Sequence, residues 1–101
     1  MKKIAIFGSG RGSNAENCIN YFKSHKSISI KLIFTNNPNA GIIDVAKKNK
    51  IDFKIFTKAD FISPEEILKD LKFHEVSFII LAGFLLKIPE LIIANFKNAI
   101  I

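Results

Sequence analysis

The sequence predicts an α/β fold built on a doubly wound parallel sheet, and three observations carry this prediction. Continuous apolar runs recur along the chain, as in strands that are buried on both faces. Each run is followed by a segment whose apolar residues have helical spacing. The connections between these segments are short and rich in Gly, Pro, Asn and Ser. Such alternation indicates parallel strands that are joined by helical crossovers.

The first half of the chain starts with an apolar strand, and its helices begin at typical start signals. Strands are expected over residues 2–8, 28–35 and 53–56, and helices over residues 13–24 and 41–48. Ser13 to Glu16 match a capping box, which predicts that Ser13 caps the first helix. Residues 36–39 (Asn-Asn-Pro-Asn) have the composition of a turn.

The second half alternates in the same way. Ser63 and Pro64 predict a helix start, with Ser63 as the cap and the proline in the first turn. The buried face of that helix is expected to contain Ile67, Leu68 and Leu71. A strand is expected over residues 76–82, a helix from Pro89, and the start of a fifth strand over residues 98–101. Three residues of the last helix are expected to face the core: Ile92, Ile93 and Phe96.

This element order predicts a Rossmann-like, three-layer αβα arrangement with strand order 3-2-1-4-5. The order reverses between the first and fourth strands. Ligands of such sheets bind at this switch point, beyond the carboxyl ends of the strands. Two segments are therefore expected to face each other there. We call residues 8–14 the glycine turn and residues 82–88 the apolar turn.

Composition narrows the function classes. A chain of 101 residues with 49% hydrophobic residues is one domain or part of one, and it can build a core. The net charge is +6, but the lysines are spread along the chain and form no basic stripe with aromatic residues, which disfavours nucleic-acid binding. The longest apolar run, residues 78–86, is too short to span a membrane. The apolar run that follows Met1 ends at Gly8, so we expect no export signal and a cytoplasmic protein.

The glycine turn, Gly-Ser-Gly-Arg-Gly-Ser-Asn, connects a predicted strand to a predicted helix. Glycines allow close backbone approach, and the first N–H groups of a helix lack internal partners and attract anions. The turn is therefore interpreted as a phosphate cradle. The alternative is a tight connection without a ligand, capped by Ser13.

Two common phosphate signatures fail at this turn. A Walker loop would need Gly and Lys where the chain has Ser13 and Asn14. A dinucleotide fingerprint would need a third glycine at Ser13 and an acidic residue at the end of the second strand, where the chain has Thr35, Asn36 and Asn37. A single terminal phosphate fits better, bound by Gly12, Ser13 and Asn14. Arg11 either adds charge to the cradle or lies in solvent.

The apolar turn is too hydrophobic for a free surface loop. Its apolar residues and those next to it are Leu81, Phe84, Leu85, Leu86, Ile88 and Ile93. They form either a slot for a flat ring, bound partly by main-chain groups, or core packing between the fourth strand and the following helix. The turn alone supports both interpretations equally.

The two turns together resemble the glycinamide ribonucleotide formyltransferases, in their N-terminal half only. The resemblance lies in residues 6–14 (Ile-Phe-Gly-Ser-Gly-Arg-Gly-Ser-Asn), 34–37 and 81–89 (Leu-Ala-Gly-Phe-Leu-Leu-Lys-Ile-Pro). It implies formyl transfer from 10-formyltetrahydrofolate to the amine of glycinamide ribonucleotide, a step of purine biosynthesis. It also implies that Gly12, Ser13 and Asn14 hold the 5′-phosphate.

The same resemblance implies a folate slot at the apolar turn and a catalytic centre elsewhere. Leu85, Leu86, Lys87 and Ile88 would line the pterin slot, mainly through their main chain. Pro64 and Leu86 stand where the family often carries basic residues. The family's catalytic Asn-x-His and its later Asp follow the fifth strand, so no catalytic residue is expected within residues 1–101, and no metal site. We therefore expect the N-terminal nucleotide-binding portion of a longer formyltransferase, inactive on its own.

The remaining reactive side chains are interpreted as structural or solvated. Cys18, the single cysteine, is expected to be a buried thiol on the first helix. His25 and His74 are expected to be solvated, at the end of the sheet opposite the two turns, and Asp44, Asp52 and Asp60 to be surface charges.

Two other functions stay open on the residues alone. One is a non-catalytic, flavodoxin-like mononucleotide-binding module, and the other is a fragment of an NAD-dependent oxidoreductase. An apolar sheet edge at the fifth strand also favours association, so a homodimer is expected.

Overall fold

A computed structural model describes residues 2–84 and 86–101. It contains a parallel four-stranded sheet in the order β3-β2-β1-β4, which confirms the predicted strand order. Its strands are β1 (Lys2–Phe7), β2 (Ile28–Thr35), β3 (Asp52–Ile55) and β4 (Phe78–Leu81). Ile100 forms a parallel bridge with Ile79 of β4, so the segment expected as a fifth strand lies beside β4.

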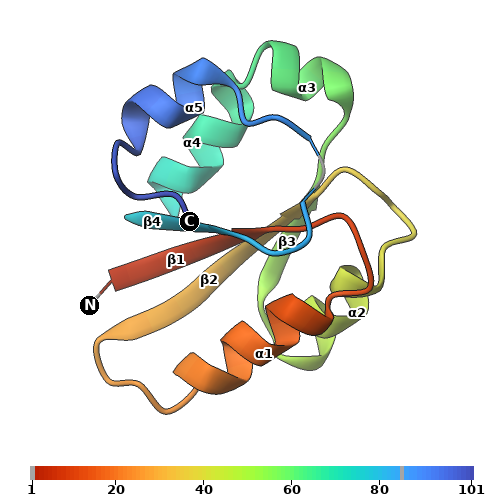
Figure 1. Cartoon of the computed structure of the whole chain (residues 1–101), viewed down its shortest axis with the longest axis vertical. Helices are drawn as coiled ribbons and strands as arrows, with labels where there is room; N and C mark the ends of the chain where they lie inside the picture. The colour runs from red at the N-terminus through yellow and green to blue at the C-terminus, as the bar shows by residue number, and fades with distance from the viewer. Residues whose placement is uncertain (1, 85) are drawn as a thin grey trace.

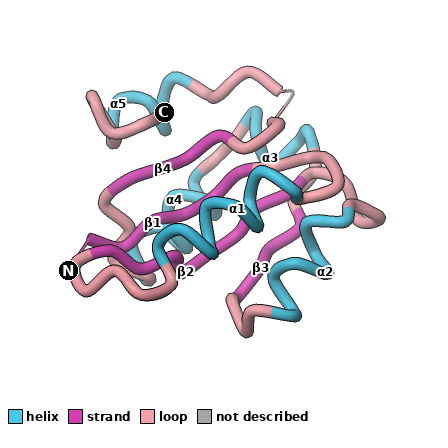
Figure 2. The backbone as a smooth tube through the Cα atoms, turned by 60° about the horizontal axis from the view of Figure 1, so that its bottom comes forward, coloured by secondary structure: helices cyan, strands magenta, loops and turns pink. Residues whose placement is uncertain are grey.

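Helices cover both faces of the sheet and give the predicted three layers (Figure 1). They are α1 (Ser13–Phe22), α2 (Gly41–Lys48), α3 (Lys58–Ile62), α4 (Glu65–Phe73) and α5 (Glu90–Asn95). Figure 1 shows α1 and α2 on one face and α3, α4 and α5 on the other. The turned view in Figure 2 shows the extended sheet passing between these two groups of helices. No helix in the described part of the chain is long and apolar enough to cross a membrane.

The two central strands are buried over their carboxyl-terminal halves, Ile4–Phe7 of β1 and Leu32–Thr35 of β2, because each face packs against helices there. Phe7 of β1 and Phe34 of β2 belong to the hydrophobic core under α3, α4 and α5. Their neighbours Ile6 and Ile33 belong to the core under α1 and α2. Successive strand residues point to opposite faces, so both alternating sets must be apolar. This arrangement confirms that the continuous apolar runs mark strands buried on both sides.

The predicted cap of α1 is wrong by one residue. Gly12 is the N-cap, in the left-handed conformation with φ 89°, and no side chain caps the helix. Ser13 is already the first helical residue, so Ser13 and Glu16 form no capping box. Glu16 instead lies 3.2 Å from Nζ of Lys48 on α2, which ties the two helices of this face together.

The predicted start of α4 is also corrected. Ser63 ends α3, and Pro64 is the N-cap of α4, with no side-chain cap. The short helix α3 was not predicted, although a complete capping box marks it. The Thr57 side chain accepts a hydrogen bond from the Asp60 N–H, and the Asp60 carboxylate accepts one from the Thr57 N–H.

The predicted buried faces hold with two exceptions. Ile67, Leu68 and Leu71 of α4 are buried, as are Ile92 of α5 and the following Phe96. Ile93 is 44% exposed and does not face the core. Residues four apart share a helix face, whereas Ile93 is rotated about 100° away from Ile92. On α1, Cys18 is half-buried against the core under α1 and α2 rather than fully buried.

Candidate functional site

The glycine turn is attached to two neighbouring elements at the carboxyl edge of the sheet. The Gly8 N–H donates to the carbonyl of Phe34, the next-to-last residue of β2, at 3.0 Å. The Gly10 carbonyl accepts a hydrogen bond from the N–H of Ile42 in the first turn of α2 at 3.3 Å. Backbone groups of the turn thus continue the sheet on one side and satisfy a free helix N–H on the other.

Close packing explains two of the three glycines in the turn. A Cβ atom on Gly12 would lie 2.7 Å from the Cα of Ile42, and one on Gly8 would lie 2.8 Å from the carbonyl oxygen of Ala82. A Cβ on Gly10 would meet nothing within 4 Å. On α2, Gly41 makes a matching approach, because its Cβ would lie 2.5 Å from the carbonyl oxygen of Arg11. Gly10 is therefore the one glycine of the turn that packing does not require.

The residues predicted to hold a phosphate lie together at the start of α1. Gly12 is half-buried, whereas Ser13 and Asn14 are exposed. The first bonded N–H of the helix is that of Glu16, which donates to the Gly12 carbonyl at 2.7 Å. The preceding N–H groups have no partner within the helix and carry the positive end of its dipole. This arrangement can bind an anion through main-chain groups. Arg11 is exposed.

The apolar turn lies against the glycine turn, as the predicted switch point requires. The Ala82 N–H donates to the carbonyl of Phe7, the last residue of β1, at 2.9 Å. The apolar turn thus leaves β4 directly beside the point where the glycine turn leaves β1. The sheet therefore places the N-terminus of α1 and an apolar segment at one edge.

Phe84 fixes the apolar turn to the core. Its ring lies 5.6 Å from that of Phe7 and 5.6 Å from that of Phe61 on α3, both centroid to centroid. Phe61 in turn stacks on Phe56 at 4.5 Å. Core packing therefore accounts for Phe84, and α3 contributes to the support of the turn.

The residues predicted to line the folate slot have different environments. Ile88 is buried, Leu86 is half-buried against the same core as Phe84, and Lys87 is exposed. Leu85 lies outside the described residues. Pro64, which stands where the family often has a basic residue, is buried.

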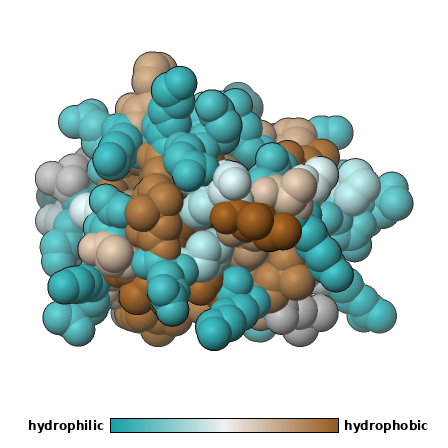
Figure 3. Space-filling view, turned by 90° about the horizontal axis from the view of Figure 1, so that it is seen from above, coloured by the Kyte–Doolittle hydropathy of each residue, from teal (hydrophilic) through white to brown (hydrophobic). Residues whose placement is uncertain are grey.

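Two hollows flank Ile88. One of about 290 Å³ lies between α3 and the apolar turn, and one of about 420 Å³ lies towards α5, against Leu81 and Phe96. Figure 3 shows the molecule from the side of α3, α4 and α5, where apolar side chains reach the surface between hydrophilic ones. Space for an apolar ring thus exists beside the predicted slot.

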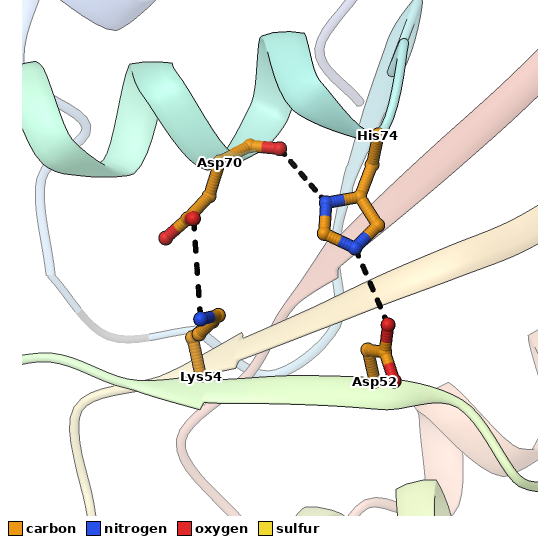
Figure 4. A network of polar contacts seen from close by, with 4 residues as sticks. All are labelled: Asp52, Lys54, Asp70 and His74. Carbon is orange, nitrogen blue, oxygen red and sulfur yellow. Dashed lines mark hydrogen bonds and ion pairs between the residues drawn. The ribbon is translucent and has the colours of Figure 1, made fainter.

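A further hollow, of about 630 Å³, lies at the opposite, amino edge of the sheet. A polar network lines it (Figure 4). The ring of His74 lies 2.9 Å from the carbonyl oxygen of Asp70 and 3.3 Å from a carboxylate oxygen of Asp52. Lys54 lies 4.0 Å from the Asp70 carboxylate. This network joins the start of β3 to the end of α4.

The histidines lie at the amino edge as predicted, but only one of them is solvated. His25 is exposed, whereas the His74 side chain is 17% exposed, which corrects the prediction that it is solvated. No group of three or more metal-ligating side chains is found among the residues that the structure describes.

A second charge pair at the amino edge changes a pKa. Nζ of Lys3 donates to the Glu75 carboxylate at 2.7 Å. This hydrogen bond, and then the charge of Lys3, lower the pKa of Glu75 from its ordinary value of 4.5. The pair lies at the end of the sheet away from both turns, so it has no part in the candidate site.

Comparison with known proteins identifies the family. A family model described as formyl transferase matches residues 2–101. The chain belongs to the formyl transferase family. Among curated relatives, it is 33% identical over 112 residues to the chloroplastic phosphoribosylglycinamide formyltransferase of Arabidopsis thaliana, covering 99% of this chain and 36% of the relative. It is 32% identical over 108 residues to the phosphoribosylglycinamide formyltransferase of Bacillus subtilis, covering 100% of this chain and 54% of the relative.

Solved structures give the same result. Glycinamide ribonucleotide transformylase 1 from Geobacillus kaustophilus superposes with a TM-score of 0.91 at 26% identity, over 99% of this chain and 56% of that chain. A formyltetrahydrofolate deformylase from Pseudomonas putida has a TM-score of 0.84 at 14% identity, which supports the fold alone. The chain spans between about a third and just over half of the length of these relatives.

Proposed function

We propose that this chain forms the substrate-positioning part of a phosphoribosylglycinamide formyltransferase. The reaction would transfer a formyl group from 10-formyltetrahydrofolate to the amine of glycinamide ribonucleotide. One observation carries the proposal: the exposed N-terminus of α1 lies at the switch point beside the apolar turn. Family membership and the activity for which the relatives are named support this substrate pair.

The glycine turn would bind the 5′-phosphate of the ribonucleotide. Gly12 directs the chain into α1, and Ser13 and Asn14 supply N–H groups, a hydroxyl and an amide at an exposed helix terminus. A helix terminus favours an anion by roughly 0.3–1 kcal/mol through its dipole, in addition to the hydrogen bonds of the N–H groups. Fixing the phosphate would direct the rest of the substrate along the carboxyl edge, towards the apolar turn.

The apolar turn would bind the pterin ring of the folate. Leu86, Lys87 and Ile88 are the described residues of the predicted slot, and hollows lie on both sides of Ile88. In the transfer, the amine nitrogen forms a bond to the formyl carbon, and the bond from that carbon to the folate nitrogen breaks. Stabilising the intermediate oxyanion and moving the proton require polar groups, and no described residue is assigned to these roles.

An NMR titration of the isotope-labelled chain tests the phosphate site. Inorganic phosphate, and separately glycinamide ribonucleotide, should shift the amide signals of Gly12, Ser13 and Asn14. The signals around Ser24, at the other end of α1, serve as an internal reference. If neither ligand shifts the three amide signals, the phosphate site is wrong. Shifts with flavin mononucleotide or NADH at lower concentration than with the ribonucleotide would instead favour one of the alternative nucleotide-binding functions.

Two matched variants separate charge from folding. Ser13→Asp places a carboxylate in the cradle, and Ser24→Asp adds the same charge at the far end of α1, where the residue is also exposed. We expect Ser13→Asp to weaken phosphate binding at least about tenfold, because like charges repel at short range, while Ser24→Asp leaves it nearly unchanged. An acidic residue at the start of a helix favours the fold, so loss of binding in Ser13→Asp would not reflect unfolding.

The remaining proposals concern the cosubstrate, the assembly and the location. Tetrahydrofolate should shift the amide signals of Leu86, Lys87 and Ile88 if the apolar turn is its slot.

Sedimentation of the purified chain tests the expected homodimer. A cytoplasmic location stays a prediction from the sequence.

A further inference from the structure

A side-chain contact links the glycine turn to the end of β2. The hydroxyl of Ser9 donates to the side-chain oxygen of Asn36 at 2.7 Å, in a part-buried position. The two residues are 27 positions apart in the sequence. Among contacts between described residues, this is the one hydrogen bond that a side chain of residues 8–14 makes. We call this contact the Ser9–Asn36 latch.

The β2 side of the latch is held firmly. Thr35 is fully buried, and its carbonyl accepts a hydrogen bond from the Phe56 N–H at 2.9 Å. Its hydroxyl oxygen accepts one from the Asn37 N–H at 3.2 Å. Asn36 thus lies between two residues whose backbone positions are already determined, so its side chain can serve as a fixed point.

On the glycine-turn side of the latch, the backbone at Gly10 has fewer fixing contacts than its neighbours. Gly8 is fixed by the Phe34 carbonyl and Gly12 by its contact with the backbone of Ile42. Between them, Gly10 has open space around it and a single carbonyl contact, to the Ile42 N–H. Glycine loses more conformational freedom on ordering than any other residue, so this part of the turn gains most from an added contact. Ser9 lies directly before Gly10.

We propose that Ser9 and Asn36 are positioning residues that order the glycine turn for anion binding; the ligand part of this proposal rests on the proposed function. The latch restricts the turn before the ligand arrives, so less ordering accompanies binding. The amide also suits the site because it is neutral. A carboxylate at position 36 could accept the same hydrogen bond from the Ser9 hydroxyl, but it would place a negative charge beside a site for an anion.

Single-residue variants test the latch. Ser9→Ala and Asn36→Ala remove it, and Ser9→Thr retains the hydroxyl. Asn37→Ala is the matched control, because it deletes a neighbouring amide whose oxygen accepts a hydrogen bond from the Asn39 N–H rather than from the glycine turn. The first readout is the backbone order parameter of residues 10–12 in the ligand-free chain, from ¹⁵N relaxation. The second is the dissociation constant for inorganic phosphate, from the amide shifts of residues 12–14.

We expect Ser9→Ala and Asn36→Ala to lower the order parameters and to weaken phosphate binding roughly fivefold, the equivalent of about 1 kcal/mol for one neutral hydrogen bond. Ser9→Thr should restore both values, and Asn37→Ala should change neither. Asn36→Asp should keep the turn ordered yet weaken phosphate binding, which a purely structural role would not produce.

The outcomes separate the latch from the phosphate site. If the parent chain shows no phosphate shifts, the proposed site fails, and the order parameters alone decide the latch. If Ser9→Ala and Asn36→Ala leave residues 10–12 as ordered as Asn37→Ala does, the latch is overturned. If they loosen the turn while phosphate affinity stays constant, the positioning role is overturned although the contact exists.

Discussion

The glycine turn and the apolar turn lie side by side at one edge of the sheet, yet opposite means hold them in place. The glycine turn is fixed by the absence of side chains, because Gly8 and Gly12 let its backbone touch Ala82 and Ile42 directly. The apolar turn is fixed by a side chain, the ring of Phe84, while its own glycine, Gly83, has open space around it.

This difference has a functional consequence. Where backbone packs on backbone, the remaining N–H groups of the turn and of α1 stay available to a ligand. Where a ring fixes the chain, the surroundings are apolar and hollow, as around Ile88. The same edge therefore offers one polar and one apolar environment, which is what a phosphate ester and a flat ring require of a shared cleft.

The largest expected effect comes from filling the backbone contact of the glycine turn. In Gly12→Ala, the new Cβ would lie 2.7 Å from the Ile42 Cα, and the residue would keep a φ of 89°, which is unfavourable for alanine. Steric overlap and backbone strain together should lower the free energy of unfolding by roughly 3 kcal/mol. Urea unfolding followed by circular dichroism measures the change.

Gly10→Ala is the control for this prediction. Its Cβ meets no atom within 4 Å, and Gly10 does not have a positive φ. The free energy of unfolding should therefore change by less than about 0.5 kcal/mol. Equal destabilisation by both substitutions would mean that the turn is not held by contacts at Gly12.

An intermediate effect is expected from the ring that holds the apolar turn. Phe84→Ala removes edge contacts to Phe7 and Phe61 from a half-buried position and should destabilise the fold by roughly 2 kcal/mol. Phe73→Ala, at a position that is 83% exposed, should change stability by less than about 0.5 kcal/mol. Urea unfolding of both variants checks the prediction. If Phe84→Ala costs as little as Phe73→Ala, side-chain packing does not fix this turn.

Much of the fold can be predicted from local sequence patterns. Errors in the prediction occur mainly where contacts between distant residues determine the local structure. The apolar runs predict β1 and β2 because both of their faces are buried. The cap of α1 is different. Gly12 and Ser13 are both acceptable caps by sequence, and the contact between Gly12 and Ile42 selects the glycine. No helix is predicted from the sequence at α3, because the start signal of Ser63 and Pro64 follows closely, although Thr57 and Asp60 form a capping box.

The candidate site shows the same division. Its position follows from the strand order, and the exposed N-terminus of α1 follows from the glycine-rich sequence. The contacts that support the glycine turn do not follow from local sequence. Gly41 approaches Arg11, and Ser9 donates a hydrogen bond to Asn36, across long stretches of chain. The environment of His74 was missed for this reason, since its partner Asp52 belongs to another strand.

The smallest effect is expected at the amino edge, where neither turn is involved. Lys3 lowers the pKa of Glu75, so the folded state favours the charged carboxylate. Its stabilising contribution is present above the ordinary pKa of 4.5 and is lost as the pH falls through the lowered value of the folded state. Glu75→Gln should therefore lower the urea midpoint slightly at pH 7, and the difference between the two proteins should vanish towards pH 3. Because the pair is solvated, the change is small, and phosphate binding at the other end of the sheet should be unaltered. A pH-independent difference would show that the charge of Glu75 does not cause it. A change in phosphate affinity would show that the two edges of the sheet are coupled.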